Sequence, residues 1–329
     1  MSARRVGIIG TGFMGGIHAD AWDAIGHSPV AMLGNGSSSA AELARRHGAT
    51  VFTALDEFLD AVDIVDICTP THLHVSYALA AAAAGKPTLC EKPLALDSDS
   101  GRRVVDAFEA AGVAFQVAHI LRYSPEYAIA RARVEAGDIG QPAVLRLSRR
   151  SFAPKRAGES WFADSSKSGG IVFDLMIHDL DYARWVAGEV TRVYARSTSG
   201  DRTQAVAILS HENGAVSHVE SSWALPAPHF RTAFEIAGSE GLIQFSSEET
   251  TPLEVCLHDD GGGGDTGLGE TDLASNPFHA EVRAFLDQLD GAAPVMSPGD
   301  ALAAVRIAGA VNHSLETGRP VAIEKEGTR

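Results

Sequence analysis

Apolar and polar residues follow different patterns in the two halves of the chain. Over roughly the first 120 residues, short apolar runs alternate with longer segments that carry apolar residues at helical spacing. The runs predicted as strands are 6–9, 30–33, 63–68, 87–90 and 113–118, and the clearest helical segments are 16–24, 72–84 and 97–111. This alternation predicts a doubly wound parallel sheet.

After residue 122 the predicted strands follow one another with only turns between most of them. They lie at 143–150, 190–196, 205–209, 215–222, 232–237, 242–245, 253–257 and 321–323. Helical patterns occur at 125–136, 170–188, 278–289 and 300–317. Short strands joined by turns predict an antiparallel sheet. We therefore expect an α/β protein of two domains, residues 1–121 and residues 122–329.

The composition is that of an ordinary globular protein and excludes several classes of partner. The chain has 329 residues, of which 45% are hydrophobic and 21% charged, enough for about two domains. Its net charge of −15 argues against binding to nucleic acid or to an anionic membrane. The three cysteines lie far apart and match no metal spacing, which fits a reducing, cytoplasmic setting. No run approaches the ~20 apolar residues of a membrane span.

The first predicted strand runs directly into a glycine-rich loop and then a helix. Gly10 permits a tight turn, Gly12 lets a phosphate approach the backbone, and Gly15 lets the helix pack closely on the strand. The start of the helix adds free N–H groups and the positive end of its dipole. This order favours dinucleotide binding over the alternative, a glycine-rich turn without function.

The segment after the second strand bears on the choice between NAD and NADP. Enzymes that use NAD usually place an acidic residue there, but residues 34–39 contain none, and the next acid is Glu42. Ser37 at the start of a predicted helix can donate to a phosphate, and Arg45 or Arg46 is near enough in sequence to reach it. The sequence favours NADP, with a loop that accepts both cofactors as the alternative.

Glu91, Lys92 and Pro93 follow a buried strand without a spacer. Ligands of open α/β sheets bind outside the carboxyl ends of the strands, so Lys92 should face the binding crevice. Partial burial favours its neutral amine, which can exchange a proton. His74 follows another strand and should border the same crevice. The alternatives are a surface turn at Lys92 and a packing role for the histidine.

The predicted helix at 170–188 carries a second candidate pair. Asp174 and His178 are four residues apart and therefore lie on one face, opposite an apolar stripe. The alternative is a solvated helix face. No metal is expected, because no third ligand stands at metal spacing and no cysteine cluster occurs.

Together these motifs resemble the glucose-fructose oxidoreductase / inositol dehydrogenase family, often called Gfo/Idh/MocA. The matching segments are Gly10-Thr11-Gly12-Phe13-Met14-Gly15 with His18, Thr69-Pro70 with His74, Ala83-Ala84-Gly85-Lys86-Pro87, Glu91-Lys92-Pro93, Arg122-Tyr123-Ser124-Pro125, and Gly169-Gly170 with Asp174 and His178. They occur in the family's order and roughly its spacing, over most of the chain. The resemblance implies an N-terminal Rossmann domain and a C-terminal α/β domain with a large, mostly antiparallel sheet. Because that sheet often forms an oligomer interface, a homodimer or homotetramer is expected.

The resemblance also implies roles for individual residues. It assigns proton transfer to Lys92 and His178, leaving open which is the base, and orientation of the substrate or the histidine to Asp174. A cis bond between Lys92 and Pro93 is a further expectation. The expected cofactor-binding residues are Gly10, Gly12, Phe13, Met14, Gly15, Asn35, Ser37, Thr69, Pro70, His74 and Glu91. The expected substrate-binding residues are Lys92, Arg122, Trp161, Asp174 and His178, although Arg122 could equally hold the two domains together.

The function implied by the resemblance is hydride transfer between a nicotinamide cofactor, NADP or NAD, and a small substrate. That substrate is a secondary alcohol or carbonyl of a sugar, an inositol-like polyol or a related compound. Two alternatives are an NAD-dependent glycosidase with internal redox and a cofactor-binding sensor without catalysis. A purely structural oligomer is the least favoured, given the glycine loop.

Overall fold

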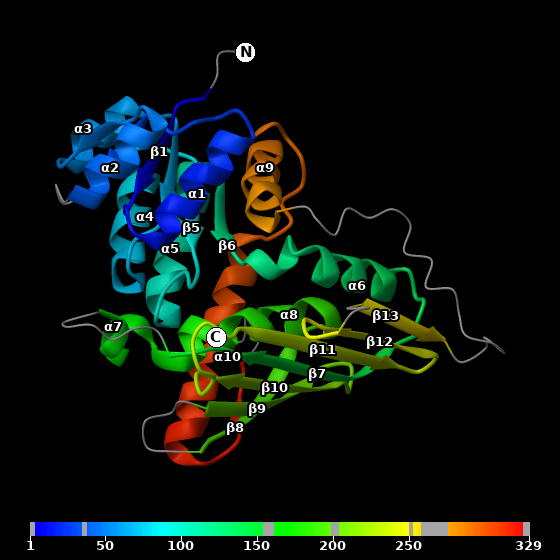
Figure 1. Ribbon diagram of the computed structural model, residues 1–329. Coiled ribbons are helices and arrows are strands. Elements are labelled where there is room, and N and C mark those ends of the chain that lie inside the picture. The colour runs from blue at the N-terminus through cyan, green and yellow to red at the C-terminus, as the bar shows by residue number, and fades with distance from the viewer. Residues whose placement is uncertain are drawn as a thin grey trace. The chain divides into compact units, whose positions relative to one another are not determined.

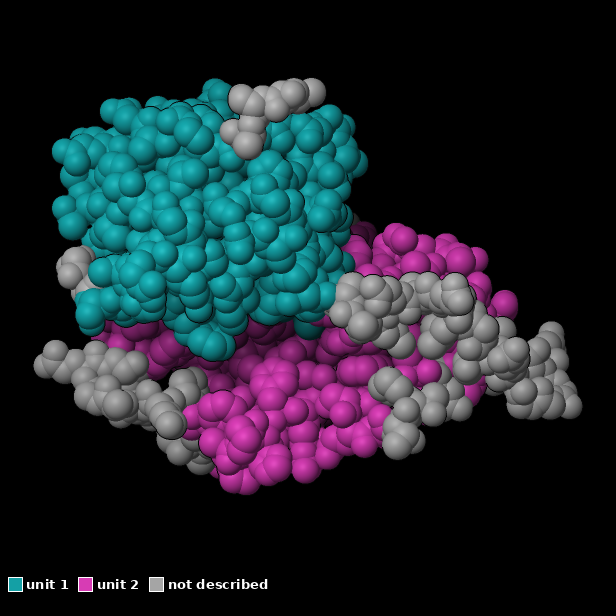
Figure 2. Space-filling model, turned by 45° about the horizontal axis from the view of Figure 1, so that its top comes forward, with its two compact units in different colours: residues 1–123, 275–302 teal, residues 124–274, 303–329 magenta. Residues whose placement is uncertain are grey.

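The computed structural model describes residues 4–34, 38–153, 161–198, 204–249, 253–257 and 276–324. The chain divides into two compact units, coloured separately in Figure 2: residues 1–123 with 275–302, and residues 124–274 with 303–329. The first change of unit lies close to the predicted boundary at 121. The predicted division into 1–121 and 122–329 does not include the return of residues 275–302 to the first unit.

The first unit is built on a six-stranded parallel sheet with the order β3-β2-β1-β4-β5-β6. Its strands are β1 (Val6–Ile9), β2 (Ala31–Leu33), β3 (Thr50–Phe52), β4 (Ile64–Ile67), β5 (Thr88–Glu91) and β6 (Phe115–Ala118). The strand order changes direction between β1 and β4, where doubly wound sheets bind dinucleotides. The predicted Rossmann fold is confirmed.

Helices cover both faces of this sheet. They are α1 (Phe13–Ala24), α2 (Ser38–His47), α3 (Leu55–Ala61), α4 (His74–Ala83), α5 (Ser98–Ala111) and α9 (Pro277–Leu289). Figure 1 shows α9, drawn in orange, beside the blue helix α1, and one core cluster joins Trp22 of α1 and Phe285 of α9 to the strands. On the opposite face, Phe108 of α5 stacks on Phe115 of β6. A segment from late in the chain thus completes the core around the first helix.

The second unit is built on an eight-stranded sheet with the order β13-β12-β11-β7-β10-β9-β8-β14. Its strands are β7 (Pro142–Arg150), β8 (Val190–Ser197), β9 (Gln204–His211), β10 (Val216–Ser222), β11 (Arg231–Gly238), β12 (Gly241–Ser246), β13 (Leu253–Leu257) and β14 (Val321–Ala322). In the described part of the chain β7 and β10 pair in parallel and the other pairs are antiparallel. The prediction of a large, mostly antiparallel sheet is confirmed.

One face of this sheet is covered by helices and the other keeps apolar side chains in solvent. The helices are α6 (Pro125–Glu135), α8 (Ile177–Ala187) and α10 (Pro298–Thr317), of which α10 begins in the first unit. Tyr127 of α6 and Tyr182 of α8 meet edge to face at 4.8 Å, and both rings lie against Phe234 of β11. On β9 and β10, Ile208 and Val216 are 42% and 40% exposed.

The segment between β7 and α8 is less regular than the predicted helix at 170–188. It contains a 3₁₀ turn (Trp161–Ala163), the short helix α7 (Ser165–Ser168) and a π-helical turn (Val172–Met176) that leads into α8. Two further 3₁₀ turns, Thr71–Leu73 and Ile120–Arg122, belong to the first unit. Among the described residues, no helix is both long enough and apolar enough to cross a membrane.

Candidate active site

The glycine loop between β1 and α1 is open only at its middle glycine. Gly10 has a φ of +101°, and a Cβ there would lie 2.6 Å from the carbonyl oxygen of Cys68, just after β4. A Cβ at Gly15 would overlap the carbonyl oxygen of Gly10, so the helix packs against the loop backbone. A Cβ at Gly12 would meet nothing within 4 Å. The turn, the close packing and the open approach are those expected of a phosphate-binding loop.

The start of α1 suits an anion. Gly12 caps the helix without a side-chain hydrogen bond, and the first turn contains no acidic residue. The first N–H groups of a helix have no partner within it, so those that follow Gly12 can donate to a phosphate. Close to the end of β4, the buried hydroxyl oxygen of Thr69 has no hydrogen-bond partner among the described residues. These features fit a dinucleotide.

The other residues predicted to bind the cofactor differ in how far they are buried. The side chain of Phe13 is 83% exposed, in the first turn of α1. Asn35 and Ser37 lie outside the described residues. His74 is buried with its two ring nitrogens 2.7 Å from Pro93 O and 2.9 Å from Thr69 O. Burial lowers the pKa of His74. Since a neutral imidazole carries one N–H, the ring donates to one of the two carbonyls and packs the ends of β4 and β5 together.

Lys92 emerges from a buried segment at the carboxyl end of β5. From Thr88 to Ala95 every residue is buried except Lys92. The bond between Lys92 and Pro93 is cis, as expected. The surroundings of Lys92 are therefore those of a side chain presented by a fixed backbone at the ligand-binding edge of the sheet, and they disfavour the alternative of a surface turn.

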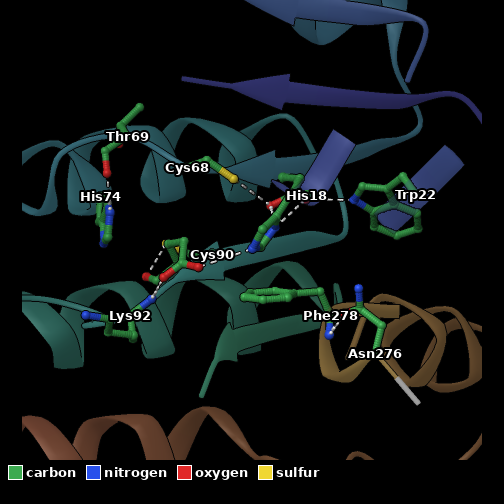
Figure 3. Close-up of polar contacts among 11 residues, drawn as sticks. His18, Trp22, Cys68, Thr69, His74, Cys90, Lys92, Asn276 and Phe278 are labelled. Carbon is green, nitrogen blue, oxygen red and sulfur yellow. Dashed lines mark hydrogen bonds and ion pairs between the residues drawn. The ribbon is translucent and has the colours of Figure 1, made fainter. Parts of the chain in front are cut away.

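Beside this edge lies a buried polar network that the sequence reading did not anticipate (Figure 3). His18 of α1 places Nδ1 2.9 Å from Asp66 Oδ2 and Nε2 3.1 Å from Glu91 Oε1. The indole N–H of Trp22 donates to Asp66 at 2.7 Å, and the thiol of Cys68 donates to the same carboxylate at 3.5 Å. The network joins α1, β4 and β5, and all of its side chains are buried.

His18, Asp66 and Cys68 also have the donor atoms of a metal site. Metal ligands each lie about 2.0–2.3 Å from a shared tetrahedral ion and so stand farther apart than a hydrogen-bonded pair. The 2.9 Å between His18 and Asp66 is instead a hydrogen-bond distance, and the second ring nitrogen of His18 is engaged by Glu91. The geometry supports a proton-bearing network.

Glu91 connects the network to Lys92. While Oε1 faces His18, Oε2 accepts the backbone N–H of Lys92 at 3.0 Å. Burial by itself raises the pKa of Glu91, but the hydrogen bond and charge of His18, together with the charges of Lys92 and His74, outweigh burial and lower the pKa. Glu91 is thus an ionised, buried carboxylate with a partner for each oxygen.

The second unit presents the other predicted pair. Between Ile171 and Ala183 every residue is buried except Asp174 and His178. Asp174 lies in the π-helical turn and His178 in the first turn of α8. Turns of π-helix occur frequently at functional sites. Burial of Asp181 shows that the polar side chains of this segment do not form a solvated face.

A buried ion pair holds α8 beside His178. The guanidinium of Arg149 on β7 donates to both carboxylate oxygens of Asp179, at 2.8 and 3.1 Å, and to the hydroxyl of Tyr127 at 3.2 Å. Burial raises the pKa of Asp179, and the charge of Arg149 limits that rise. Periodicity gave no signal for this pair, because its members are thirty residues apart.

Two predicted substrate residues make contacts within their own units. The buried guanidinium of Arg122 donates to Val295 O at 3.0 Å and lies 3.4 Å from Asp300, both in the first unit. Those contacts bind the segment between α9 and α10. Trp161 stacks on Phe162, with ring centroids 3.9 Å apart.

Family models and known proteins match both parts of the chain. The model described as the oxidoreductase family with an NAD-binding Rossmann fold matches residues 4–119, and the GFO/IDH/MocA C-terminal domain matches residues 127–244. Levoglucosan dehydrogenase of Pseudarthrobacter phenanthrenivorans is 31% identical over 79% of this chain and 78% of its own. The NAD(+)-dependent scyllo-inositol 2-dehydrogenase of Bacillus subtilis is 30% identical over 80% of this chain and 78% of its own.

The fold is shared with solved structures over nearly its whole length. A levoglucosan dehydrogenase in complex with NADH and L-sorbose has a TM-score of 0.88 and 27% identity, covering 99% of this chain and 100% of that one.

Proposed function

The chain belongs to the Gfo/Idh/MocA family of oxidoreductases, and we propose that it transfers a hydride between a nicotinamide cofactor and the CH–OH group of a sugar or polyol. The similar proteins named above include dehydrogenases for levoglucosan and for scyllo-inositol. The observation that carries the proposal is Lys92, the one accessible residue in a buried segment at the ligand-binding edge of a dinucleotide-binding sheet.

Oxidation of an alcohol removes a hydride and a proton from the substrate. The C–H electron pair leaves with hydrogen as hydride, which the oxidised nicotinamide accepts when the cofactor is bound. The hydroxyl proton must pass to a base. Lys92 or His178 takes that proton, and Asp174 orients the substrate or the imidazole. The exposure of Asp174 and His178 in an otherwise buried segment supports these roles. Trp161 and Arg122 are proposed to border the substrate.

The cofactor-binding residues proposed on the same grounds surround the glycine loop and the ends of β4 and β5. The open space at Gly12 and the start of α1 without a side-chain cap support a pyrophosphate there. So does the Thr69 hydroxyl, which has no hydrogen-bond partner in the part of the chain that the structure describes. Pro70 and His74 complete the proposed set, together with Asn35 and Ser37 outside the described residues. Glu91 is expected from the sequence to bind cofactor, but its two oxygens are engaged by His18 and by the Lys92 N–H, and we assign it to the buried network instead.

We further propose that NADP is preferred over NAD. No carboxylate occurs from Gly34 to Ala41, and the first one, Glu42, is paired with Arg45 at 2.7 Å. The ratio of kcat/KM for the two cofactors tests this preference. The variant Asn35→Asp, which adds the missing carboxylate, should move the ratio toward NAD, whereas a strong NAD preference in the wild type would refute the proposal.

The outer face of the second sheet supports assembly into a homodimer or homotetramer. Ile208 and Val216 lie exposed on neighbouring strands, where a monomer gains nothing from apolar side chains. Light scattering of the purified protein should give a mass of two or four chains. The variant Ile208→Glu should lower that mass if this face is the interface.

A reducing compartment, the cytoplasm, is the proposed location. Cys68 and Cys90 are buried, and neither takes part in a disulfide. Burial raises the pKa of both thiols, which keeps them in the unreactive neutral form.

The experiment that tests the proposed reaction is a panel of sugars and polyols, followed through the absorbance of NAD(P)H with each cofactor. At least one secondary alcohol should give turnover that depends on the cofactor. Release of aryl alcohol from an aryl glycoside without net formation of NAD(P)H would instead identify the internal-redox glycosidase. Cofactor binding without turnover of any compound would favour the sensor.

A further inference from the structure

His18 is placed to act on the Lys92 backbone through one intervening side chain. It lies on α1, immediately after the glycine loop, and is completely buried. Each of its ring nitrogens faces a carboxylate: Asp66 at 2.9 Å and Glu91 at 3.1 Å. Ionised carboxylates only accept hydrogen bonds, so a ring that satisfies both must donate from both nitrogens and carry a positive charge.

The second oxygen of Glu91 extends this chain of contacts to Lys92. It accepts the backbone N–H of Lys92 at 3.0 Å, and the next residue, Pro93, has no N–H to offer. Three hydrogen-bonded groups therefore run from the helix behind the glycine loop to the residue that presents the lysine. Figure 3 shows His18 and Lys92 at the two ends of this run.

Titratable groups face His18 from each element packed against it. β4 contributes Asp66, the residue just after it contributes the thiol of Cys68, and β5 contributes Glu91. Helix α9 contributes Glu281, which interacts electrostatically with His18. Burial by itself lowers the pKa of His18, but the charge and hydrogen bond of Asp66, together with the contributions of Cys68, outweigh burial and raise the pKa well above its ordinary value. Charged groups near Glu91 also include Lys92.

Glu281 differs from the other two acids of the cluster. It is fully buried, and neither of its carboxylate oxygens has a hydrogen-bond partner among the described residues. Burial raises the pKa of Glu281 well above its ordinary value, so this acid holds its proton. The cluster therefore contains one cation, His18, two carboxylates that hold it, and one neutral acid.

We propose that His18 is a positioning residue for Lys92: fixed by Asp66, its imidazolium holds the Glu91 carboxylate, which in turn holds the backbone of Lys92. This inference rests on the proposed function, in which Lys92 exchanges the substrate proton. A side chain there that served packing alone would require neither two carboxylate partners nor a charge. Their burial carries a large desolvation cost, which the contact with the reactive segment explains.

The test compares two acids of the same cluster by the same conservative change. Glu91→Gln removes a charge from the network, whereas Glu281→Gln replaces a neutral acid by a neutral amide of similar shape. Glu91→Gln should lower kcat about 100-fold, as misplacement of a reacting group by ~1 Å does, and should leave cofactor binding unchanged. Glu281→Gln should leave both quantities at their wild-type values.

A second readout does not depend on turnover. The rate at which Lys92 is acetylated, followed by mass spectrometry of its peptide, reports the fraction of neutral amine at each pH. The charges of Glu91 and Lys92 interact, so removing the Glu91 charge in Glu91→Gln should move the midpoint of this profile to lower pH. Glu281→Gln should not move it. A side chain with only a structural role would leave the midpoint in place in both variants.

Two variants of His18 test which of its two contacts, with Glu91 or with Asp66, affects activity. In His18→Gln the amide nitrogen can still reach Glu91, whereas in His18→Asn the shorter amide reaches only Asp66. Activity should therefore fall further in His18→Asn, and the Gln variant should recover part of it. If either protein fails to fold, the Glu91 and Glu281 pair decides the question alone.

The outcomes separate this inference from the proposed function. Turnover by the wild type together with unchanged kcat and an unchanged acetylation midpoint in Glu91→Gln would overturn the positioning role and leave the function intact. A raised cofactor Kd with unchanged kcat would also overturn it, because Glu91 would then bind cofactor directly. If no alcohol is turned over, the proposed function fails, and a shifted midpoint in Glu91→Gln would still support the coupling between Glu91 and Lys92.

Discussion

Replacing Gly12 by alanine separates the folding of the glycine loop from its binding of a dinucleotide. Gly12 has a φ of −82°, which alanine adopts without strain, and its added Cβ would meet nothing within 4 Å. The folded chain therefore tolerates the methyl group. Alanine restricts the unfolded chain more than glycine does, which offsets its weaker preference for the N-cap position, so the variant should keep the wild-type stability to within about 1 kcal/mol.

Cofactor binding, by contrast, should weaken. The space that the methyl group fills is the space through which a pyrophosphate approaches the backbone at the start of α1. Inserting a methyl group into a closely packed contact costs about 1–3 kcal/mol, which corresponds to a rise in Kd of about 5- to 150-fold. Calorimetric titration with NADP and NAD, alongside thermal unfolding without cofactor, measures both effects.

Two neighbouring glycines provide the controls. Gly16→Ala places its Cβ 3.9 Å from Arg46 and 4.0 Å from Leu43, on the side toward α2, and should raise stability without changing the Kd. Gly15→Ala overlaps the carbonyl oxygen of Gly10 and should destabilise the fold itself. Wild-type cofactor affinity in Gly12→Ala would refute the assignment of this loop to the pyrophosphate.

Two further predictions concern buried ionisable groups. Arg149→Met leaves Asp179 buried without its ion-pair partner and should lower the free energy of unfolding by about 3–5 kcal/mol in urea titrations. The double variant with Asp179→Leu should recover part of that loss. Equal stability of the single and double variants would contradict this account. Folded Glu281 keeps a proton that the unfolded chain releases above its ordinary pKa of 4.5, so its contribution to stability is present below that pH and is lost as pH rises toward the raised folded pKa. Glu281→Gln should therefore match the wild type in thermal unfolding at about pH 4 and exceed it at about pH 8, and an equal difference at both pH values would show that the carboxyl is not the cause.

The sequence predicted those parts of the fold that rest on local patterns. Gly10, Gly12 and Gly15 identify their loop because the turn, the phosphate approach and the helix packing each require a glycine. The strands β1, β4 and β5 are recognisable as short, mainly apolar segments because all of their residues are buried. The short edge strand β3 (Thr50–Phe52) was missed, since its residues are only partly buried and carry no such run.

Other features depend on contacts between distant residues, and local periodicity does not report them. The return of α9 to the first unit rests on apolar contacts between helices more than 250 residues apart in sequence. The π-helical turn before α8 reads as ordinary helix in the sequence. A carboxylate within an apolar strand was the available signal for the buried network, because Asp66 interrupts β4 and must find partners. His18 and Trp22, one helical turn apart on α1, are those partners.

The central claim, that Lys92 exchanges the substrate proton, is tested most directly by Lys92→Ala assayed with the best alcohol of the panel. Lys86→Ala is the matched control, because the Lys86 ammonium donates to Val62 O at 2.9 Å and has no part in the proposed chemistry. We predict that Lys92→Ala binds cofactor as the wild type does and loses about 10²- to 10⁴-fold in kcat, while Lys86→Ala keeps its turnover. Wild-type kcat in Lys92→Ala would contradict the account.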